Sequence, residues 1–101
     1  MAFQVELSPK SHEDLAGIYE YVSIQSVRAA EEICQSIIER AESLEEFADR
    51  GRIVPEFLDE GIKKYRQILE GHYRIIYRYI GSIVYIVRIV DSRQLLNMDF
   101  E

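Results

Sequence analysis

Residues 73–90, YRIIYRYIGSIVYIVRIV, decide the fold of this chain. Val, Ile and Tyr fit a pleated, half-buried surface better than a helix, and the run is broken once, at Gly81-Ser82. A short glycine-containing break between two such runs is typical of a β-hairpin, so we predict antiparallel strands over roughly 73–80 and 83–90. One face of each strand is apolar or aromatic, and the other mixes Ile and Val with arginine. We expect the first face to be buried and the second to be used in an interaction.

The three arginines of the hairpin are Arg74, Arg78 and Arg88. If the hairpin has plain register, alternation places them on the same sheet face as Ile76 and Ile86. The tyrosines of this part of the chain are expected mainly in core or sheet packing; they are Tyr65, Tyr73, Tyr77, Tyr79 and Tyr85.

Two amphipathic helices are predicted before the hairpin. Ser8 suits the N-cap of the first helix, and Pro9 suits its first position, where a missing N–H costs nothing. Apolar residues at three- and four-residue spacing continue this helix until shortly before Ser26. Ser26 can cap a second helix whose apolar period lasts for about six turns, to Ala48, before Gly51 ends it.

The remaining segments complete an α+β fold. Residues 3–7 alternate apolar and polar side chains as a short strand, residues 51–61 form a predicted loop, and residues 64–69 form a strand before the hairpin. The order is therefore β-α-α-β-β-β in a single domain of residues 1–101. We predict a helical hairpin packed on a small antiparallel meander, with the N-terminal strand beside the last strand.

Composition and length restrict the class of protein. With 48% hydrophobic residues the chain can bury a core, and its single cysteine, Cys34, excludes an intrachain disulfide. The first ten residues lack the basic segment and apolar core of a signal peptide, and no apolar run is long enough to cross a bilayer. We therefore expect a soluble cytoplasmic protein with no membrane partner.

Charge is distributed unevenly along the chain. The formal net charge is −6, but residues 1–62 carry 5 Lys/Arg and 14 Asp/Glu, whereas residues 63–93 carry 7 Lys/Arg and 2 Asp/Glu. This asymmetry indicates a surface for an acidic or polyanionic partner on the C-terminal half. The alternative is that the sheet arginines pair internally with helix carboxylates. The predicted partner-binding residues are Lys63, Lys64, Arg66, Arg74, Arg78, Arg88 and Arg93.

No complete catalytic or metal site is predicted. His12 falls in a first helical turn, His72 in a hairpin turn and Cys34 on an apolar helix stripe, so we expect no nucleophilic triad. The chain also lacks CxxC, HExxH and the glycine-rich phosphate-binding motifs. We predict no metal, no cofactor and no small-molecule substrate.

Two motifs carry a resemblance to a known family: GRIVPE at residues 51–56 and YRIIY at residues 73–77. In this order, between a helix that begins SHEDLAGIYEYV and a final strand that reads IVRIVDSRQLL, they make the chain resemble the RelE/ParE superfamily of type II toxin–antitoxin toxins over nearly its whole length. The resemblance implies a small bacterial growth inhibitor that is neutralised by a cognate antitoxin encoded alongside it.

The superfamily has two main mechanisms. RelE-like members are ribosome-dependent mRNA endonucleases, and Arg74 and Arg93 match arginines that this branch uses in catalysis. ParE-like members inhibit DNA gyrase and have no established hydrolytic site.

The chain departs from the nuclease pattern at three places. Many members have a histidine followed by a basic pair where this chain reads DSRQ at residues 91–94, and their clustered lysines are reduced here to Lys63 and Lys64. A C-terminal catalytic tyrosine has no counterpart, because Phe100 lacks a hydroxyl. The general acid–base set is therefore incomplete. We favour a ParE-like toxin that binds DNA gyrase and is not a nuclease; the alternatives are a RelE-like mRNA endoribonuclease acting on the ribosome and mRNA, and a non-toxic binding module of the same fold.

Overall fold

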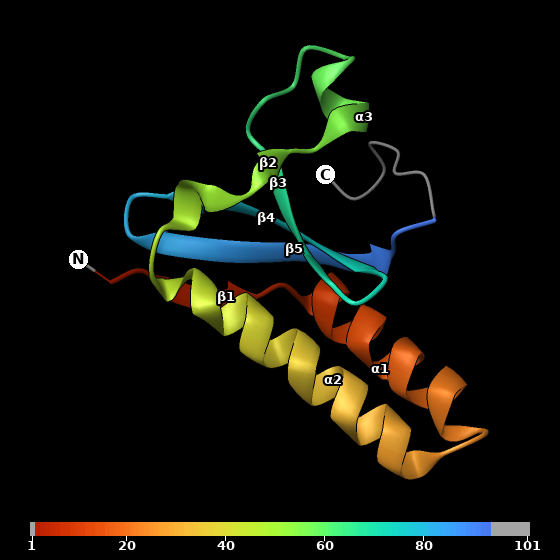
Figure 1. The fold of residues 1–101 in the computed structure, drawn as a ribbon. Coiled ribbons are helices and arrows are strands. Elements are labelled where there is room, and N and C mark those ends of the chain that lie inside the picture. Colours follow the sequence, from red (N-terminus) through yellow and green to blue (C-terminus); the bar gives the residue numbers. More distant parts are fainter. Residues whose placement is uncertain (1, 94–101) are drawn as a thin grey trace.

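The computed structural model describes residues 2–93 of the chain (Figure 1). A short strand comes first, two long helices follow, three strands come last, and short elements lie between the helices and these strands. The elements in order are β1 (Gln4–Leu7), α1 (Pro9–Ser23), α2 (Val27–Glu42), the 3₁₀ helices η1 (Ser43–Glu45) and η2 (Ala48–Arg50), β2 (Arg52–Ile53), α3 (Pro55–Leu58), β3 (Arg66–Glu70), β4 (Tyr73–Ile80) and β5 (Ile83–Asp91).

The strands form one sheet in the order β1-β5-β4-β3-β2. β1 runs parallel to β5, and all other neighbours are antiparallel. The predicted α+β class, the meander and the N-terminal strand beside the last strand are confirmed. Figure 1 shows α1 and α2 side by side on one side of the sheet and α3 on the other. We call these two sheet surfaces the helix face and the α3 face.

Serine caps set the starts of both long helices, as predicted. The Ser8 hydroxyl accepts a hydrogen bond from the Ser11 amide at 3.0 Å, and the Ser26 hydroxyl accepts one from the Ala29 amide at 3.0 Å. Each bond satisfies a donor that the first turn of a helix leaves unpaired. None of the helices in residues 2–93 combines the length and apolar composition that crossing a bilayer requires.

The predicted second helix is too long. α2 ends at Glu42, and the chain continues through η1 and η2, with Phe47 between them in the left-handed region at φ 57° and ψ 58°. An α-helix cannot pass through that conformation. Gly51 is extended, at φ −72° and ψ 152°, so it is not the left-handed glycine that ends a helix. The apolar period continues to Ala48 because η1 and η2 pack against the same core.

The segment predicted as a loop over residues 51–61 contains two short elements, β2 and α3. β2 pairs with the start of β3, which begins at Arg66 rather than at residue 64. Pro55 occupies the first position of α3, where its ring is compatible with a helix and its missing N–H leaves no bond unmade.

The hairpin contains a β-bulge, so its register is not plain. Ile76 lies opposite Arg88, but the next residue, Tyr77, lies opposite Ile86, which leaves Val87 as the extra residue. An extra residue reverses the alternation beyond it. Ile86 therefore lies on the helix face, and the prediction that it shares a face with the hairpin arginines is wrong.

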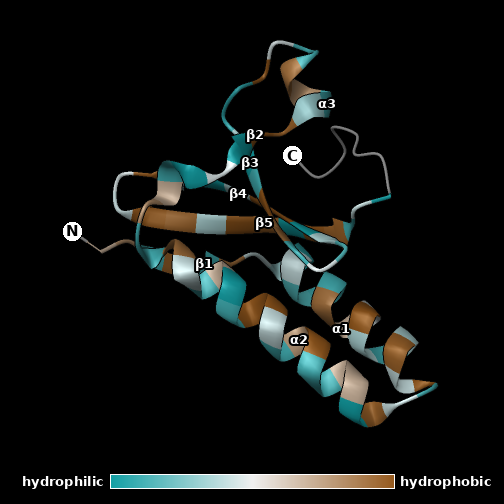
Figure 2. Ribbon diagram, viewed as in Figure 1, coloured by the Kyte–Doolittle hydropathy of each residue, from teal (hydrophilic) through white to brown (hydrophobic). Residues whose placement is uncertain are grey.

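The sheet is covered on both faces, though unequally. The larger core lies on the helix face and includes Ile37, Ala41, Leu44, Ile75, Tyr77, Val84, Ile86 and Ile89. A smaller core lies on the α3 face and consists of Val54, Phe57, Tyr65 and Ile76. Figure 2 shows α1 and α2 banded in hydrophobic and hydrophilic colours, as expected of helices with one buried face. Only part of the α3 face is left for an interaction.

Candidate functional site

Arg74 is the most completely paired of the sheet arginines. It lies on the α3 face of β4, and 5% of its surface is exposed. Its two terminal nitrogens donate to the two Glu56 carboxylate oxygens at 2.8 Å each. Its Nε and Nη2 donate to the Gln67 side-chain oxygen at 3.0 and 2.6 Å. A guanidinium held by a carboxylate in this bidentate way is fixed in position and charge.

The loop that carries Glu56 is attached to the sheet at a second point. The Gly51 amide donates to the Tyr77 hydroxyl at 3.0 Å, and this hydroxyl donates to the Ala48 carbonyl at 2.6 Å. A Cβ on Gly51 would lie 2.5 Å from the Tyr77 hydroxyl, so only glycine allows this approach. Burial raises the pKa of Tyr77, and the hydrogen bond from Gly51 opposes the rise.

These contacts explain why the two motifs occur together. GRIVPE begins with the glycine that packs against Tyr77 and ends with the glutamate that pairs with Arg74. Tyr77 and Arg74 both belong to YRIIY, so each motif supplies one residue to each of the two contacts. The motifs are therefore two halves of one structural unit, which contacts β4 through Tyr77 on the helix face and through Arg74 on the α3 face.

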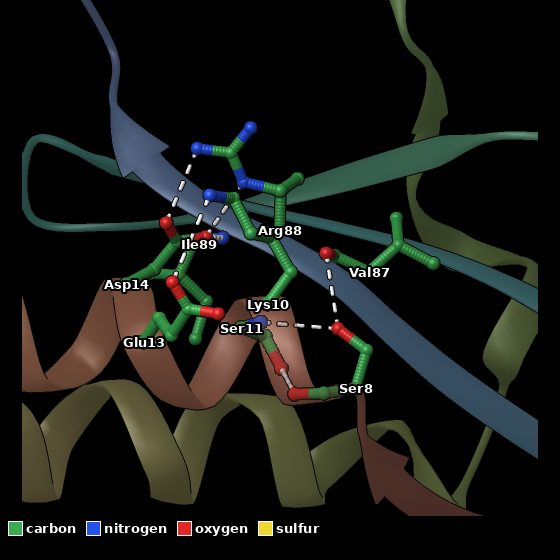
Figure 3. Close-up of polar contacts among 8 residues, drawn as sticks. All are labelled: Ser8, Lys10, Ser11, Glu13, Asp14, Val87, Arg88 and Ile89. Carbon is green, nitrogen blue, oxygen red and sulfur yellow. Dashed lines mark hydrogen bonds and ion pairs between the residues drawn. The ribbon is translucent and has the colours of Figure 1, made fainter. Parts of the chain in front are cut away.

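Arg88 and its partner close the free edge of β5 (Figure 3). β1 pairs with β5 only as far as Ile86, and beyond that point the N-terminal part of α1 takes its place. The Ser8 hydroxyl donates to the Val87 carbonyl at 3.1 Å. Asp14 accepts from Arg88 at 2.8 and 3.1 Å and from the Ile89 amide at 2.8 Å. The bulged edge of β5 is thus satisfied by two polar side chains of the chain itself.

Two other arginines of the predicted set also have partners within the chain. Arg66 lies opposite Tyr77 in the sheet and donates to the carbonyls of Asp49 and Gly51 at 3.2 and 2.8 Å. Arg93, at the end of the described chain, pairs with Asp91 at 2.7 Å and is largely exposed. The hydrogen bonds from Arg93 hold the pKa of Asp91 well below its usual range.

Arg78 differs from the other sheet arginines. It lies on the α3 face of β4, opposite Tyr85, and its guanidinium carbon is 5.9 Å from the centre of the Tyr65 ring. Its Nε is buried and has no hydrogen-bond partner in residues 2–93. Lys64 lies on the same ring, with Nζ 5.3 Å from its centre, and Lys63 is exposed. Arg78 is therefore a partly buried cation that no carboxylate in the described chain neutralises.

A groove of about 580 Å³ runs between α1 and the end of β5. Ile18, Tyr21 and Tyr73 supply its apolar surface. Its charged residues are Arg88 and Arg93, which pair with Asp14 and Asp91 of the same lining, and Glu13. The structure thus separates the predicted basic set: Arg88 and Arg93 line this groove, Arg78 and Lys64 lie at the Tyr65 ring, and Arg66 lies opposite Tyr77. It does not bring all seven side chains into one patch.

The alternative that sheet arginines pair with helix carboxylates holds for Arg88 and Asp14, but the sequence did not identify the individual partners. Glu56 belongs to a quoted motif, but nothing in the motif tells which cation it meets. Asp14 and Arg88 are 74 residues apart, and Gln67 occurs in a stretch that reads only as a strand. Among residues 2–93 no group of three or more His, Cys, Asp or Glu side chains is arranged to hold a metal ion.

Comparison with known proteins places this geometry in a family. The profile of the family described as the ParE toxin of the type II toxin–antitoxin system parDE matches residues 5–96. A structure of the chromosomal ParDE system from P. aeruginosa aligns with a TM-score of 0.73 at 22% identity, over 91% of this chain and 98% of the other.

A second structure, the toxin–antitoxin complex RelBE2 from Mycobacterium tuberculosis, aligns with a TM-score of 0.65 at 18% identity, over 90% of this chain and 99% of the other. At these identities the two structures establish the fold. No curated protein matches the chain by sequence. The family profile spans most of the chain, and the chain belongs to the ParE toxin family of type II toxin–antitoxin systems.

Proposed function

We propose that this ParE-family toxin inhibits bacterial growth by binding DNA gyrase, and that a cognate antitoxin neutralises it. The observation that supports binding over RNA cleavage is the pairing of Arg74 with Glu56, at 2.8 Å through both carboxylate oxygens. A nuclease of this fold would use that arginine to stabilise a phosphate. Here a carboxylate already occupies the guanidinium, and it would repel a phosphate from the same position.

The second nuclease arginine, Arg93, is also paired, but at the surface, where its side chain is 83% exposed. Arg93 donates to both carboxylate oxygens of Asp91, at 2.9 and 2.7 Å. Both arginines that catalysis would require are therefore neutralised by acids of the chain itself. A protein that acts by binding needs no free catalytic cation, so this arrangement is compatible with gyrase inhibition and unfavourable to cleavage.

For the antitoxin we assign the charged contact to Arg78, whose buried Nε has no acceptor in residues 2–93. Arg88 and Arg93 line the groove beside α1, each already paired with an aspartate. An acidic antitoxin residue matches Arg78, and apolar anchors of the same segment match the apolar surface of that groove. Arg66 and Arg74 we assign to the architecture of the loop at residues 51–56.

Gyrase inhibition is tested with relaxed plasmid, ATP and purified gyrase. We expect the chain to abolish supercoiling at molar excess, and the product of the adjacent gene to restore it. Arg78→Met removes the proposed antitoxin contact, and Arg28→Met is its matched control, because Arg28 is an exposed α2 residue whose ion pair within residues 2–93 is with Glu32. Full supercoiling at saturating wild-type protein would refute the proposal. Cleavage of mRNA within codons in a translating extract would favour the endonuclease instead.

A further inference from the structure

Phe47 combines two unfavourable features that its own packing does not explain. It is the one non-glycine residue among residues 2–93 with a positive φ, and 72% of its surface is exposed. A bulky side chain in the left-handed region is strained. An exposed ring gains little burial to offset that strain, so the fold alone gives no reason for an aromatic residue here.

The conformation of Phe47 is nevertheless firmly held. The Arg50 amide donates to the Phe47 carbonyl at 3.0 Å, and the Arg50 guanidinium donates to the Ser43 carbonyl at 3.2 Å and to the Ser43 hydroxyl. Arg50 thereby joins η1 to η2 across the residue. The ring is presented on a fixed turn.

The ring borders a groove of about 500 Å³ at the end of the sheet where β4 turns into β5. Phe3 and Tyr79 form its aromatic wall, packed edge to face with ring centres 5.7 Å apart. Glu46 and Asp49 lie on its rim. The groove is therefore aromatic inside and acidic at its margin.

The acidic margin is not neutralised within the described chain. Neither the Glu46 nor the Asp49 carboxylate takes part in an ion pair there. Two arginines of this part of the fold donate to backbone oxygens instead: Arg50 to the carbonyls of Ser43 and Glu46, and Arg66 to those of Asp49 and Gly51. The two carboxylates are thus left for a cation from elsewhere.

We propose that this groove binds an arginine or lysine side chain, with its apolar neighbours, from a protein partner. Aromatic faces attract a cation, and the carboxylates at the rim attract the same charge. A Lys or Arg stem lies along apolar surface while its head stays at the polar margin. The volume of the groove is enough for more than one side chain.

This surface is separate from those assigned above. Tyr79 packs against the helix-face core, whereas its neighbour Arg78 lies on the α3 face of β4, and Asp91 and Arg93 lie toward the other end of β5. A basic segment could therefore occupy the groove while an acidic antitoxin occupies the Arg78 and α1 surfaces. The inference does not depend on gyrase being the target.

The test is an NMR titration of the ¹⁵N-labelled full chain with the capped tripeptide acetyl-Leu-Arg-Leu-amide. We expect saturable shifts at Phe3, Phe47 and Tyr79, and binding weaker by about fivefold or more when citrulline, a neutral isostere, replaces arginine. Equal binding of both peptides, shifts confined to other residues, or no saturation would overturn the proposal. If dilution of the chain alone moves the same resonances, a second copy fills the groove and a foreign segment does not.

Two variants separate binding from folding. Glu46→Gln with Asp49→Asn removes the margin charge at the surface and should reduce affinity for the arginine peptide about fivefold or more. Phe47→Gly should abolish binding and raise Tm, because glycine adopts the left-handed region without strain. Unchanged affinity in either variant would count against the groove, and a lower Tm for Phe47→Gly would show that the ring serves the fold.

Discussion

Arg74 and Arg78 lie four residues apart on the same face of β4, yet their surroundings differ. At the Arg74 end, the loop of residues 51–56 returns to the sheet and Glu56 and Gln67 accept four hydrogen bonds from the guanidinium. At the Arg78 end, the guanidinium lies over the Tyr65 ring and its buried Nε has no acceptor.

Hydrogen-bond partners separate the arginines of this sheet face into those that stabilise the fold and those available to bind another molecule. Buried polar groups in native proteins are nearly always paired, so a buried donor without a partner requires an explanation, and an absent binding partner is one. Charge counts along the sequence treat the two arginines alike. Their hydrogen bonds assign Arg74 to the fold and leave Arg78 for another molecule.

The largest expected effect is at Arg74. Arg74→Met removes the cation but leaves the partly buried Glu56 carboxylate, whose side chain is 22% exposed, without its partner. Breaking a buried pair from one side costs about 3 kcal/mol at the lower end of the usual range. Chemical denaturation should show this loss in the free energy of unfolding.

The double variant Arg74→Met with Glu56→Met is the control for that prediction. Replacing both charges with apolar side chains removes the unpaired carboxylate, so it should recover much of the lost stability. If the free energy of unfolding of Arg74→Met lies within about 0.5 kcal/mol of the wild-type value, Arg74 contributes no more to stability than an exposed residue. That result would contradict the assignment of Arg74 to the fold.

The sequence predicted those parts of the scaffold that have local causes. The hairpin follows from β-branched residues around Gly81. The helix starts follow from Ser8 and Ser26, whose hydroxyls accept a hydrogen bond from the amide three residues later. The order of strands follows from short connections. Each of these depends on neighbours in the chain, which a pattern can reveal.

The parts that were missed depend on contacts between distant residues. The bulge at Val87 changes the face of Ile86, and it is tied to Ser8 at the start of α1. The left-handed Phe47 ends the helical stretch although nothing in its residue type favours that conformation. The pairing of Arg74 with Glu56 decides how the site is interpreted, and it becomes visible only when the two motifs meet in space.

An intermediate effect is expected at the other attachment of the same loop. Tyr77→Phe leaves the Gly51 amide and the Ala48 carbonyl without their shared partner, at a cost of about 1–3 kcal/mol. If loss of this attachment also frees Glu56, Arg74→Met should destabilise the Tyr77→Phe variant less than it destabilises the wild type. Denaturation of the wild type, the two single variants and the double variant measures the coupling between the two attachments.

The raised pKa of Tyr77 adds a pH dependence to that variant. In the unfolded chain the phenol ionises near its ordinary value of 10.0, while the folded chain holds the proton to higher pH. The stability from this group is therefore fully present below pH 10 and is lost as pH rises above it. Tyr77→Phe should flatten this alkaline decline, although Tyr73, whose pKa is also raised, retains a share. Identical slopes between pH 9 and 11 would contradict burial of the Tyr77 hydroxyl.

The smallest effect on stability is expected at Arg78. Arg78→Met keeps an apolar stem over Tyr65 and removes a buried Nε that has no acceptor, so the free energy of unfolding should change by less than about 0.5 kcal/mol or rise. Affinity for the antitoxin, measured by calorimetry, should fall by about tenfold or more, because a desolvated arginine–carboxylate contact would be lost. Arg28→Met should leave both quantities near wild type. If Arg78→Met instead destabilises the chain as much as Arg74→Met and binds antitoxin normally, both arginines belong to the scaffold, and the antitoxin must be held by the groove beside α1.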